Sequence, residues 1–589
     1  MCGILGEIRF DSQTPNLHNI QQASDILAPR GPDGSGLFQM KNVAFAHRRL
    51  KIIDLSEHAQ QPMVDSQLGL TLVYNGAIYN YPELRKTLSN KGHQFFSHGD
   101  TEVILKAYAE WGKDCVQHLQ GMFAFAIWER DTGKMFLARD RLGIKPLYYS
   151  ALEKAFRFAS NLPSLLALGD IDTDIDPVAL HHYMSFHAVV PAPYTMLKGV
   201  RKLPPATYME ISSDGKRTET CYWQLNFETS AEEQKFTFND WQDRVLDSLR
   251  TAVKRRLVAD VPVGVLLSGG LDSSLITGLL AEAGQTGLQT FSVGFEAVGQ
   301  EKGDEFQYSD IVAKHFGTEH HQIFVDSQRL LPELANCVKA MAEPMVSHDV
   351  IGFYLLSQHV SKHVKVVQSG QGADEVFAGY HWYPPMMQSQ NPVADYAKVF
   401  FDRNHAEYSQ AVHQRFVEQD YSLQFVQQHF AQAGAPHAVD KALRLDSTIM
   451  LVDDPVKRVD NMTMAWGLEA RVPFLDHELV ELAARVPPQF KVENEGKYVL
   501  KEAARRVIPH EVIDRPKGYF PVPALKYIQG EYLDFVKQVL RDAPKRDLFN
   551  QNYVNTLLEN PTEHITPLRG SKLWQITLLE FWLQTHGIK

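Results

Sequence analysis

The sequence predicts two domains of different class: an α+β layered domain, followed by an α/β domain with a doubly wound parallel sheet. The chain has 589 residues, more than a single hydrophobic core usually covers. Up to about residue 205, short alternating runs are separated by turn residues. After about residue 236, apolar strands alternate with helices, the pattern of a parallel sheet.

In the first half, the stretch LTLVYNGAIYNY predicts a strand. FAFAIWERDTGKMFLARD and TYMEISSDGKRTETCYW predict hairpins that turn at Thr-Gly and Asp-Gly. Helical periodicity in PELRKTLSNKG and DTEVILKAYAEWGKD predicts helices between these strands. We expect the first domain to cover residues 2–205.

The polar, weakly periodic stretch QLNFETSAEEQKFTFND favours a linker, which we place at residues 206–235. The second domain then covers 236–589. WQDRVLDSLRTAVKRRL predicts an amphipathic helix, and further strands are predicted in VPVGVLL, LQTFSVGF, HHQIFV and VKVVQS. Beyond residue 380 the pattern is largely helical, with loops or insertions expected at QSQNPVADY and HFAQAGAPHA. Ligands of such a sheet bind at the C-terminal ends of its strands.

Composition excludes several classes of protein. The net charge is −11 and no basic block is present, which argues against a nucleic-acid partner. No apolar run approaches a membrane span, and the N-terminus lacks the pattern of a secretory signal. Four scattered cysteines without CxxC spacing favour a reducing cytoplasm over a disulfide framework or a zinc site. Small-molecule partners are therefore expected, and a homodimer stays open.

The stretch SGGLDSS predicts a nucleotide-binding loop. Its two glycines let backbone N–H groups approach an anion, its serines can donate to phosphate oxygens, and the following helix aims its positive end at the same point. Because Asp272 would repel bare phosphate, its carboxylate implies a bridging Mg²⁺. A helix N-cap is the plain alternative. The pattern resembles the pyrophosphate loop of ATP pyrophosphatases, which implies ATP and these binding residues: Ser268, Gly269, Gly270, Asp272 and Ser273.

A second turn, SGQGADE, follows another predicted strand and adds Asp374. Together with Asp272 it forms a candidate metal-binding pair of carboxylates. The alternative is that Asp374 and Glu375 only complement the positive end of a helix.

The sequence leaves two interpretations of Cys2 open. It is either a small buried thiol or, once Met1 is removed, a nucleophile that carries its own α-amine as base.

The motifs MCGI, RGPDGSG, HRRLKIID, YNGAIYNY, GDTEVIL, GMFAFAIW and ARDRLGIKPLYY resemble a class II glutamine amidotransferase domain. VLLSGGLDSS, SGQGADEVFAGY, DNMTMAWGLEARVPFLD, GKYVLKEAAR and DRPKGYFPVP resemble the synthetase domain of the asparagine synthetase family. The resemblance implies an N-terminal-nucleophile (αββα) glutaminase fold and an ATP-pyrophosphatase-type synthetase fold. It also implies that ammonia released from glutamine passes inside the protein to a carboxylate activated as an acyl-adenylate.

The resemblance assigns roles in the glutaminase domain residue by residue. Cys2 matches the nucleophile, and Asn75 with the N–H of Gly76 matches the oxyanion hole. Arg49 matches the clamp on the α-carboxylate of glutamine, and Asp100 matches the partner of its α-ammonium.

In the synthetase domain, the resemblance places Leu266, Val293, Ser369 and Gly370 along ATP, with Asp272 and Asp374 at its pyrophosphate and Mg²⁺. Lys497 matches a catalytic lysine that neutralises the adenylation transition state. Without the family, Lys497 would be taken for an exposed lysine at a helix start.

The acceptor is expected to bind near Ser347, His348 and Gln371. Gln371 stands where asparagine synthetases carry a glutamate. The stretches MVSHD, SGQGADE, YHWYP, LRLDSTIMLVDDPVKRVDNMTMAWGLEAR and TPLRGSKLWQ resemble one subfamily, the N-acetylglutaminylglutamine amidotransferases. That resemblance implies amidation of the dipeptide carboxylate to give an osmoprotectant. Asparagine synthetase acting on aspartate is the alternative, and a non-catalytic sensor of glutamine or nucleotide is a remote one.

Overall fold

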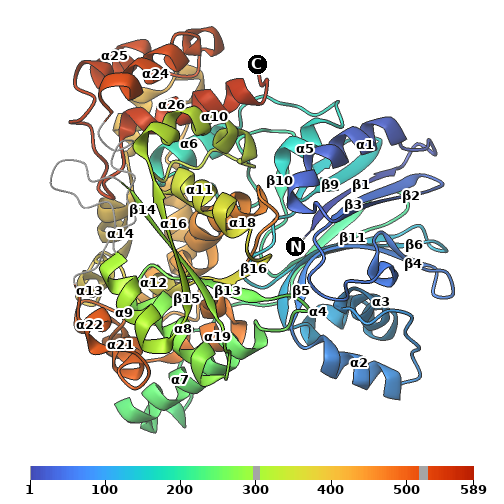
Figure 1. The fold of residues 1–589 in the computed structure, drawn as a ribbon. Helices are drawn as coiled ribbons and strands as arrows, with labels where there is room; N and C mark the ends of the chain where they lie inside the picture. The colour runs from blue at the N-terminus through green and yellow to red at the C-terminus, as the bar shows by residue number, and fades with distance from the viewer. Residues whose placement is uncertain (1, 296–305, 516–527) are drawn as a thin grey trace.

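The computed structural model describes residues 2–295, 306–515 and 528–589. Met1 and most of the DRPKGYFPVP motif lie outside these residues. Figure 1 shows the two antiparallel sheets of the first half, blue to cyan, beside the parallel sheet and the many helices of the second half, green to red.

Two six-stranded antiparallel sheets form the first half. One has the order β10-β8-β9-β1-β3-β2 and the other β12-β11-β7-β6-β5-β4. Apolar side chains between the sheets, such as Ile4, Phe45 and Trp128, form a fully buried core. The strand bounds are β1 Gly3–Arg9, β2 Gly34–Met40, β3 Val43–Arg49, β4 Met63–Asp65, β5 Leu70–Ile78, β6 Gly121–Glu129, β7 Met135–Arg139, β8 Tyr148–Ala151, β9 Ala155–Ala159, β10 Arg201–Lys202, β11 Thr207–Ile211 and β12 Arg217–Cys221.

Helices cover the outer faces of this pair of sheets, which gives the expected αββα layering. On the β1 side lie α1 Leu17–Ile26 and α5 Leu162–Leu166, and on the β5 side lie α2 Tyr81–Asn90, α3 Asp100–Trp111 and α4 Cys115–His118. The predicted strands, hairpins and helices of this half are confirmed. β11 pairs with β7 and β12 pairs with β11, so this sheet continues into the segment 206–235 that we expect to be linker. The domain boundaries themselves stay a prediction.

A five-stranded parallel sheet, ordered β15-β14-β13-β16-β17, organises the second half. β13 and β16, the two strands after which the nucleotide loops were expected, are neighbours in this sheet. The predicted doubly wound α/β class is confirmed. Its strands are β13 Val263–Leu266, β14 Gln289–Phe295, β15 Glu319–Val325, β16 Val366–Gln368 and β17 Glu469–Arg471.

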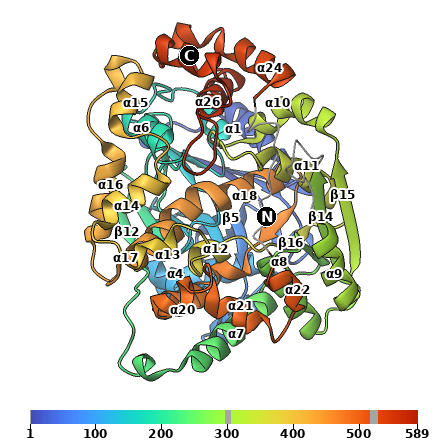
Figure 2. The ribbon, with the colours of Figure 1, turned by 90° about the vertical axis from the view of Figure 1, so that its left-hand side faces the viewer.

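The helices of the second half lie on both faces of this sheet and extend beyond it (Figure 2). α7 Phe238–Arg255 begins at a capping box formed by Thr237 and Asp240, which agrees with the predicted amphipathic helix. The other helices around the sheet are α8 Leu271–Glu282, α9 Phe306–Phe316, α10 Leu330–Ala340, α11 Val350–Val360, α12 Ala373–Val376, α18 Lys457–Met464, α19 His477–Arg485, α20 Pro488–Val492, α21 Tyr498–Ala504 and α22 His510–Ile513.

α6 Pro177–Ser185, which lies between β9 and β10 in the chain, contacts α15 and α16. Both belong to the remaining helices of the second half. These are α13 Tyr383–Met386, α14 Pro392–Phe400, α15 His405–Ala411, α16 Tyr421–Ala431, α17 Ala438–Leu445, α24 Gly530–Leu540, α25 Gln551–Glu559 and α26 Lys572–Thr585.

The expectation of a loop at QSQNPVADY is wrong for its second half. Asn391 caps α14 by accepting from the N–H of Ala394, and Pro392 occupies the first helical position, where its missing N–H costs nothing. Within the described part of the chain, no helix has both the length and the apolar composition needed to cross a bilayer.

Candidate active sites

Cys2 lies directly before β1, and its backbone N–H donates to Oδ1 of Asn75 on β5 at 2.9 Å. Both residues are buried, and Asn75 is completely so. That bond fixes the orientation of the Asn75 amide, and its Nδ2 has no hydrogen-bond partner among the described residues. A buried donor without a partner is costly, and it becomes useful when a ligand oxygen arrives beside it.

Burial raises the pKa of the Cys2 thiol above its ordinary value of 9.0. The thiol is therefore protonated near neutral pH, and a nearby base is needed to generate the nucleophilic thiolate. Gly76, the residue after Asn75, has no room for a side chain, because a Cβ there would lie 2.1 Å from the carbonyl oxygen of Met122.

Arg49 and Asp100 line the same pocket as Cys2 and Gly76, as expected. The Arg49 guanidinium donates to the carbonyl oxygens of Ser56, at 2.8 Å, and Asp54. Asp100, at the first position of α3, accepts from the Tyr74 hydroxyl at 2.8 Å. The pocket thus carries a guanidinium and a carboxylate, the two groups that complement the charged ends of an α-amino acid.

Two residues that the sequence analysis did not select also line this pocket: Glu469 and Arg471 of β17 in the parallel sheet. They form a fully buried ion pair of 2.6 Å. Arg471 also donates to the carbonyl oxygens of Arg256 and Val258, both at 2.8 Å. The wall of the Cys2 pocket therefore belongs partly to the second half of the chain. The motif GLEARVPF contains both residues, but no local pattern links them to Cys2.

The SGGLDSS turn joins the end of β13 to the start of α8, as predicted. Gly269 has a φ of +74°, and a Cβ there would lie 2.5 Å from the backbone nitrogen of Ser309. The hydroxyls of Ser268 and Ser273 lie 3.1 Å apart inside the turn. Leu266 and Val293 lie in the C-terminal parts of the adjacent strands β13 and β14, so the predicted ATP-lining positions share one edge of the sheet.

The second predicted loop meets the first. Ser369 follows β16 and donates its N–H to the carbonyl oxygen of Arg471 at 2.8 Å. A Cβ on Gly370 would lie 2.9 Å from Cβ of Asp272, so the two turns touch through this glycine.

Lys497 contacts both loops. Its Nζ lies 2.7 Å from Oδ2 of Asp272 and 2.9 Å from Oδ1 of Asp374. Burial alone would lower the pKa of this lysine, but the two carboxylates raise it above its ordinary value. Its backbone has a φ of +55°, and Gly379 packs so closely that a Cβ would lie 2.3 Å from Cε of Lys497. This lysine is 7% exposed, not the exposed helix-start residue of the alternative interpretation.

Ser347 and His348 line a separate pocket with the turn that precedes α26. The TPLRGSKLWQ motif spans this turn and the start of α26, and its contributions to the pocket include Thr566, Arg569 and Gln575. Two stretches that the sequence analysis associates with one subfamily are therefore neighbours in space. Gln371 is not among the residues lining this pocket; it stands in the turn before α12.

Comparisons with known proteins match both halves of the chain. A family model described as "Glutamine amidotransferase domain" matches residues 1–223, and one described as "Asparagine synthase" matches residues 244–584. The chain is 31% identical to asparagine synthetase (glutamine-hydrolyzing) 1 of Bacillus subtilis (strain 168), over 99% of this chain and 96% of that protein.

The chain belongs to the asparagine synthetase family. It is also 32% identical to asparagine synthetase (glutamine-hydrolyzing) 3 of the same organism, over 95% of this chain and 93% of that one. It is 26% identical to the amidase chry2 of Gibberella zeae, over 94% of this chain and 93% of that one. The family prediction is confirmed: this asparagine synthetase family member is an ATP-dependent amidotransferase ligase.

Proposed function

We propose that this chain hydrolyses glutamine at Cys2 and delivers the ammonia to a carboxylate that it activates with ATP. The observation that carries the proposal is the orientation of the Asn75 side chain. Its Oδ1 accepts from the N–H of Cys2, so its Nδ2 remains as a hydrogen-bond donor near Cys2. Such a donor stabilises the oxyanion that forms when a thiolate attacks an amide carbon.

In the glutaminase step, the α-amine of Cys2, exposed when Met1 is removed, takes the thiol proton. The sulfur then attacks the side-chain amide of glutamine. Asn75 Nδ2 and the Gly76 N–H hold the oxyanion while Arg49 and Asp100 hold the α-carboxylate and α-ammonium. Ammonia leaves, and water hydrolyses the thioester to glutamate.

In the synthetase step, the acceptor carboxylate attacks the α-phosphorus of ATP, and pyrophosphate leaves. The SGGLDSS turn and Ser369–Gly370 hold the phosphates, and Lys497 balances the charge that develops on them. Ammonia attacks the acyl-adenylate and displaces AMP. The donor set at Asp272 and Asp374, two carboxylates that meet at one Lys497 Nζ, suits Mg²⁺, which when bound neutralises the pyrophosphate charge.

The test is Cys2→Ala in the full chain. We expect loss of glutamine-dependent synthesis and retention of ammonia-dependent synthesis, measured as pyrophosphate release and amide product. An N-terminal tag that retains Met1 should give the same split, because it blocks the α-amine. Glutaminase activity that survives Cys2→Ala would contradict the proposal.

We propose N-acetylglutaminylglutamine as the acceptor. The support is the pocket that joins Ser347 and His348 to the turn of Thr566 and Arg569. The hydroxyl and amide groups of this pocket and the Arg569 guanidinium complement an amide-rich molecule that ends in a carboxylate, while the Asp402 carboxylate in its lining pairs with His187. The neutral Gln371 is consistent with an acceptor that lacks the free α-ammonium of aspartate.

Aspartate is the second candidate, favoured by the printed names of the two Bacillus relatives. The amidase of Gibberella zeae has a different name at comparable coverage, so family membership alone does not decide the acceptor. Pyrophosphate release and mass spectrometry of the product, with each acceptor in turn, separate the two. Release with aspartate and none with the acetylated dipeptide would overturn the dipeptide proposal.

A further inference from the structure

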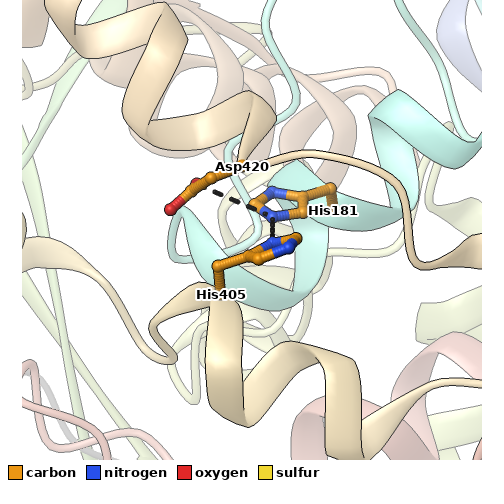
Figure 3. A group of neighbouring side chains, drawn as sticks. All are labelled: His181, His405 and Asp420. Carbon is orange, nitrogen blue, oxygen red and sulfur yellow. Dashed lines mark hydrogen bonds and ion pairs between the residues drawn. The ribbon is translucent and has the colours of Figure 1, made fainter.

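A cluster of two histidines and one carboxylate lies outside both active sites (Figure 3). His181 comes from α6, His405 from the first position of α15, and Asp420 from the position before α16. Nε2 of His181 is 3.1 Å from Nδ1 of His405 and 3.7 Å from Oδ1 of Asp420. One ligand atom from each residue lies within 4.8 Å of the other two.

These separations suit a single metal ion. With metal–nitrogen bonds of about 2.0–2.1 Å, the ligand atoms of a tetrahedral site lie about 3.3 Å apart. Two imidazoles and a carboxylate are also a donor set that zinc accepts, with a fourth position left for water. The three side chains point toward one another in Figure 3.

A buried hydroxyl is compatible with the required tautomer. Oγ of Ser422 lies 2.9 Å from Nδ1 of His181 and 3.1 Å from Nδ1 of His182. If Nδ1 of His181 donates to this oxygen, the hydroxyl proton is free to be donated to His182. The lone pair of His181 then lies on Nε2, the nitrogen that faces His405 and Asp420. Metal-bound histidines usually have their other ring nitrogen held in this way.

Burial and access also fit an ion site. His181 is 1% exposed, whereas the Asp420 side chain is 26% exposed and offers a path from solvent. The aromatic ring of Tyr408 packs 4.3 Å from the His181 ring and shields it. We propose that His181, His405 and Asp420 bind a divalent transition metal ion, which is Zn²⁺ under physiological conditions. The bound ion links α6 to α15 and α16.

The position of α6 gives the ion a structural consequence. Two residues beyond His181, the Tyr183 hydroxyl donates to the carbonyl oxygen of Gln575, and the Gln575 amide donates back to the carbonyl of Tyr183. Gln575 lines the pocket of Ser347 and His348. An ion at His181 would therefore hold one wall of that pocket through α6.

The test measures metal, not turnover. The full chain is treated with chelator, dialysed, and titrated with Zn²⁺ alone by calorimetry, with bound zinc counted by elemental analysis. We expect one ion per chain at this cluster and a higher thermal unfolding midpoint in its presence. No calorimetric binding at micromolar Zn²⁺ would overturn the proposal.

Two variants remove ligands with little risk to folding. Asp420→Asn keeps an oxygen that can cap α16 through the N–H of Leu423, and His405→Gln changes a partly exposed residue. Each should weaken zinc binding at least tenfold and abolish the shift in unfolding midpoint. His413→Gln is the matched control, because His413 pairs with Asp547 at 3.2 Å away from the cluster, and it should bind zinc like the wild type.

Co²⁺ distinguishes this cluster from other ligands in the chain. Ligand-field bands without a sulfur-to-cobalt charge-transfer band are expected, and they should disappear in Asp420→Asn. A charge-transfer band would place the ion on a cysteine such as Cys2. Binding that persists in Asp420→Asn and His405→Gln but falls in Asp272→Asn would place it at the nucleotide loops. Either outcome overturns the proposal.

Discussion

Arg30 and Asp460 form a buried ion pair that joins the two halves of the chain, with Nη1 2.9 Å from Oδ2. The Nε of the same guanidinium donates to the backbone carbonyl of Cys2 at 3.3 Å. Lys145 approaches Asp460 from the first half at 3.1 Å. Burial by itself would raise a carboxyl pKa, but the two cations hold the pKa of Asp460 below its ordinary value. One arginine therefore connects the candidate nucleophile to α18.

Removing this arginine should cost more stability than removing a surface one. Arg30→Ala leaves Asp460 buried with Lys145 as its remaining partner, and breaking a buried pair costs about 3–5 kcal/mol. We expect a clear fall in the urea midpoint and slower glutamine hydrolysis, because the Cys2 backbone loses a contact. Arg130→Ala is the control, since both Arg130 and its partner Asp131 are exposed. Equal losses in the two variants would argue against the importance of the buried pair.

Asn75→Ala should affect chemistry more than glutamine binding. It removes the Nδ2 donor proposed for the oxyanion, and loss of one such donor lowers kcat by about 10²–10³-fold. The KM for glutamine should change little, because Arg49 and Asp100 remain. Ammonia-dependent synthesis is the internal control and should stay near wild type. A rise in KM with unchanged kcat would assign Asn75 to substrate binding instead.

Lys497→Met should abolish adenylation while glutaminase activity persists. It removes the charge that Asp272 and Asp374 share, and we expect pyrophosphate release to fall at least 100-fold, the scale on which loss of one transition-state donor acts. Lys501→Met, one helical turn further along α21, is the matched control. If both variants release pyrophosphate at similar rates, Lys497 has no special role.

The stability of the chain should depend on pH through Glu375. Burial, and after it the carboxylate of Asp374, raises the pKa of Glu375 from 4.5 to about 7. An acid with a raised folded pKa binds more protons folded than unfolded, so stability falls as pH rises from 4.5 to about 7. The Gln side chain in Glu375→Gln does not ionise in this range. The urea midpoint of the variant should therefore rise relative to that of the wild type as the pH increases.

A second variant checks the assignment. The Tyr380 hydroxyl donates to Glu375 at 2.7 Å and lowers the pKa of that carboxyl. Tyr380→Phe should therefore shift the pH window upward. A gap between Glu375→Gln and the wild type that is constant with pH would contradict the titration.

Arg569→Met should selectively weaken binding of the acceptor. If this guanidinium holds the acceptor carboxylate, its loss should raise the acceptor KM about tenfold or more, as for a charge-assisted hydrogen bond. The KM values for ATP and glutamine should not change. Arg541→Met is a control on an exposed arginine of the same C-terminal region. An unchanged acceptor KM would move the acceptor away from the pocket of Ser347 and His348.

Local sequence signals sufficed for most elements. Alternation marked β5 and β6, helical periodicity marked α3 and α7, and the glycine turns after β13 and β16 lie where the parallel sheet requires its ligands. The prediction of a loop at QSQNPVADY was wrong for its second half, because the Asn391 cap and the proline after it start a helix. The polar composition of the stretch gives no sign of that helix.

Contacts between distant segments were not predictable from the sequence. Arg30 and Asp460 are 430 positions apart, and His181 and His405 are 224 apart. Glu469 and Arg471 belong to a strand of the second half, yet they face the Cys2 pocket. No periodicity or motif spacing encodes such pairings, because they depend on how the two halves pack.

The wall that Glu469 and Arg471 give to the Cys2 pocket has an evolutionary consequence. A recombinant that exchanges only residues 1–223 for those of a relative would inherit the nucleophile but meet a foreign β17. Such chimeras should recover glutamine use only when the exchanged segment and β17 come from the same parent. The two halves are therefore expected to be inherited as a single unit, even though each folds around its own sheets.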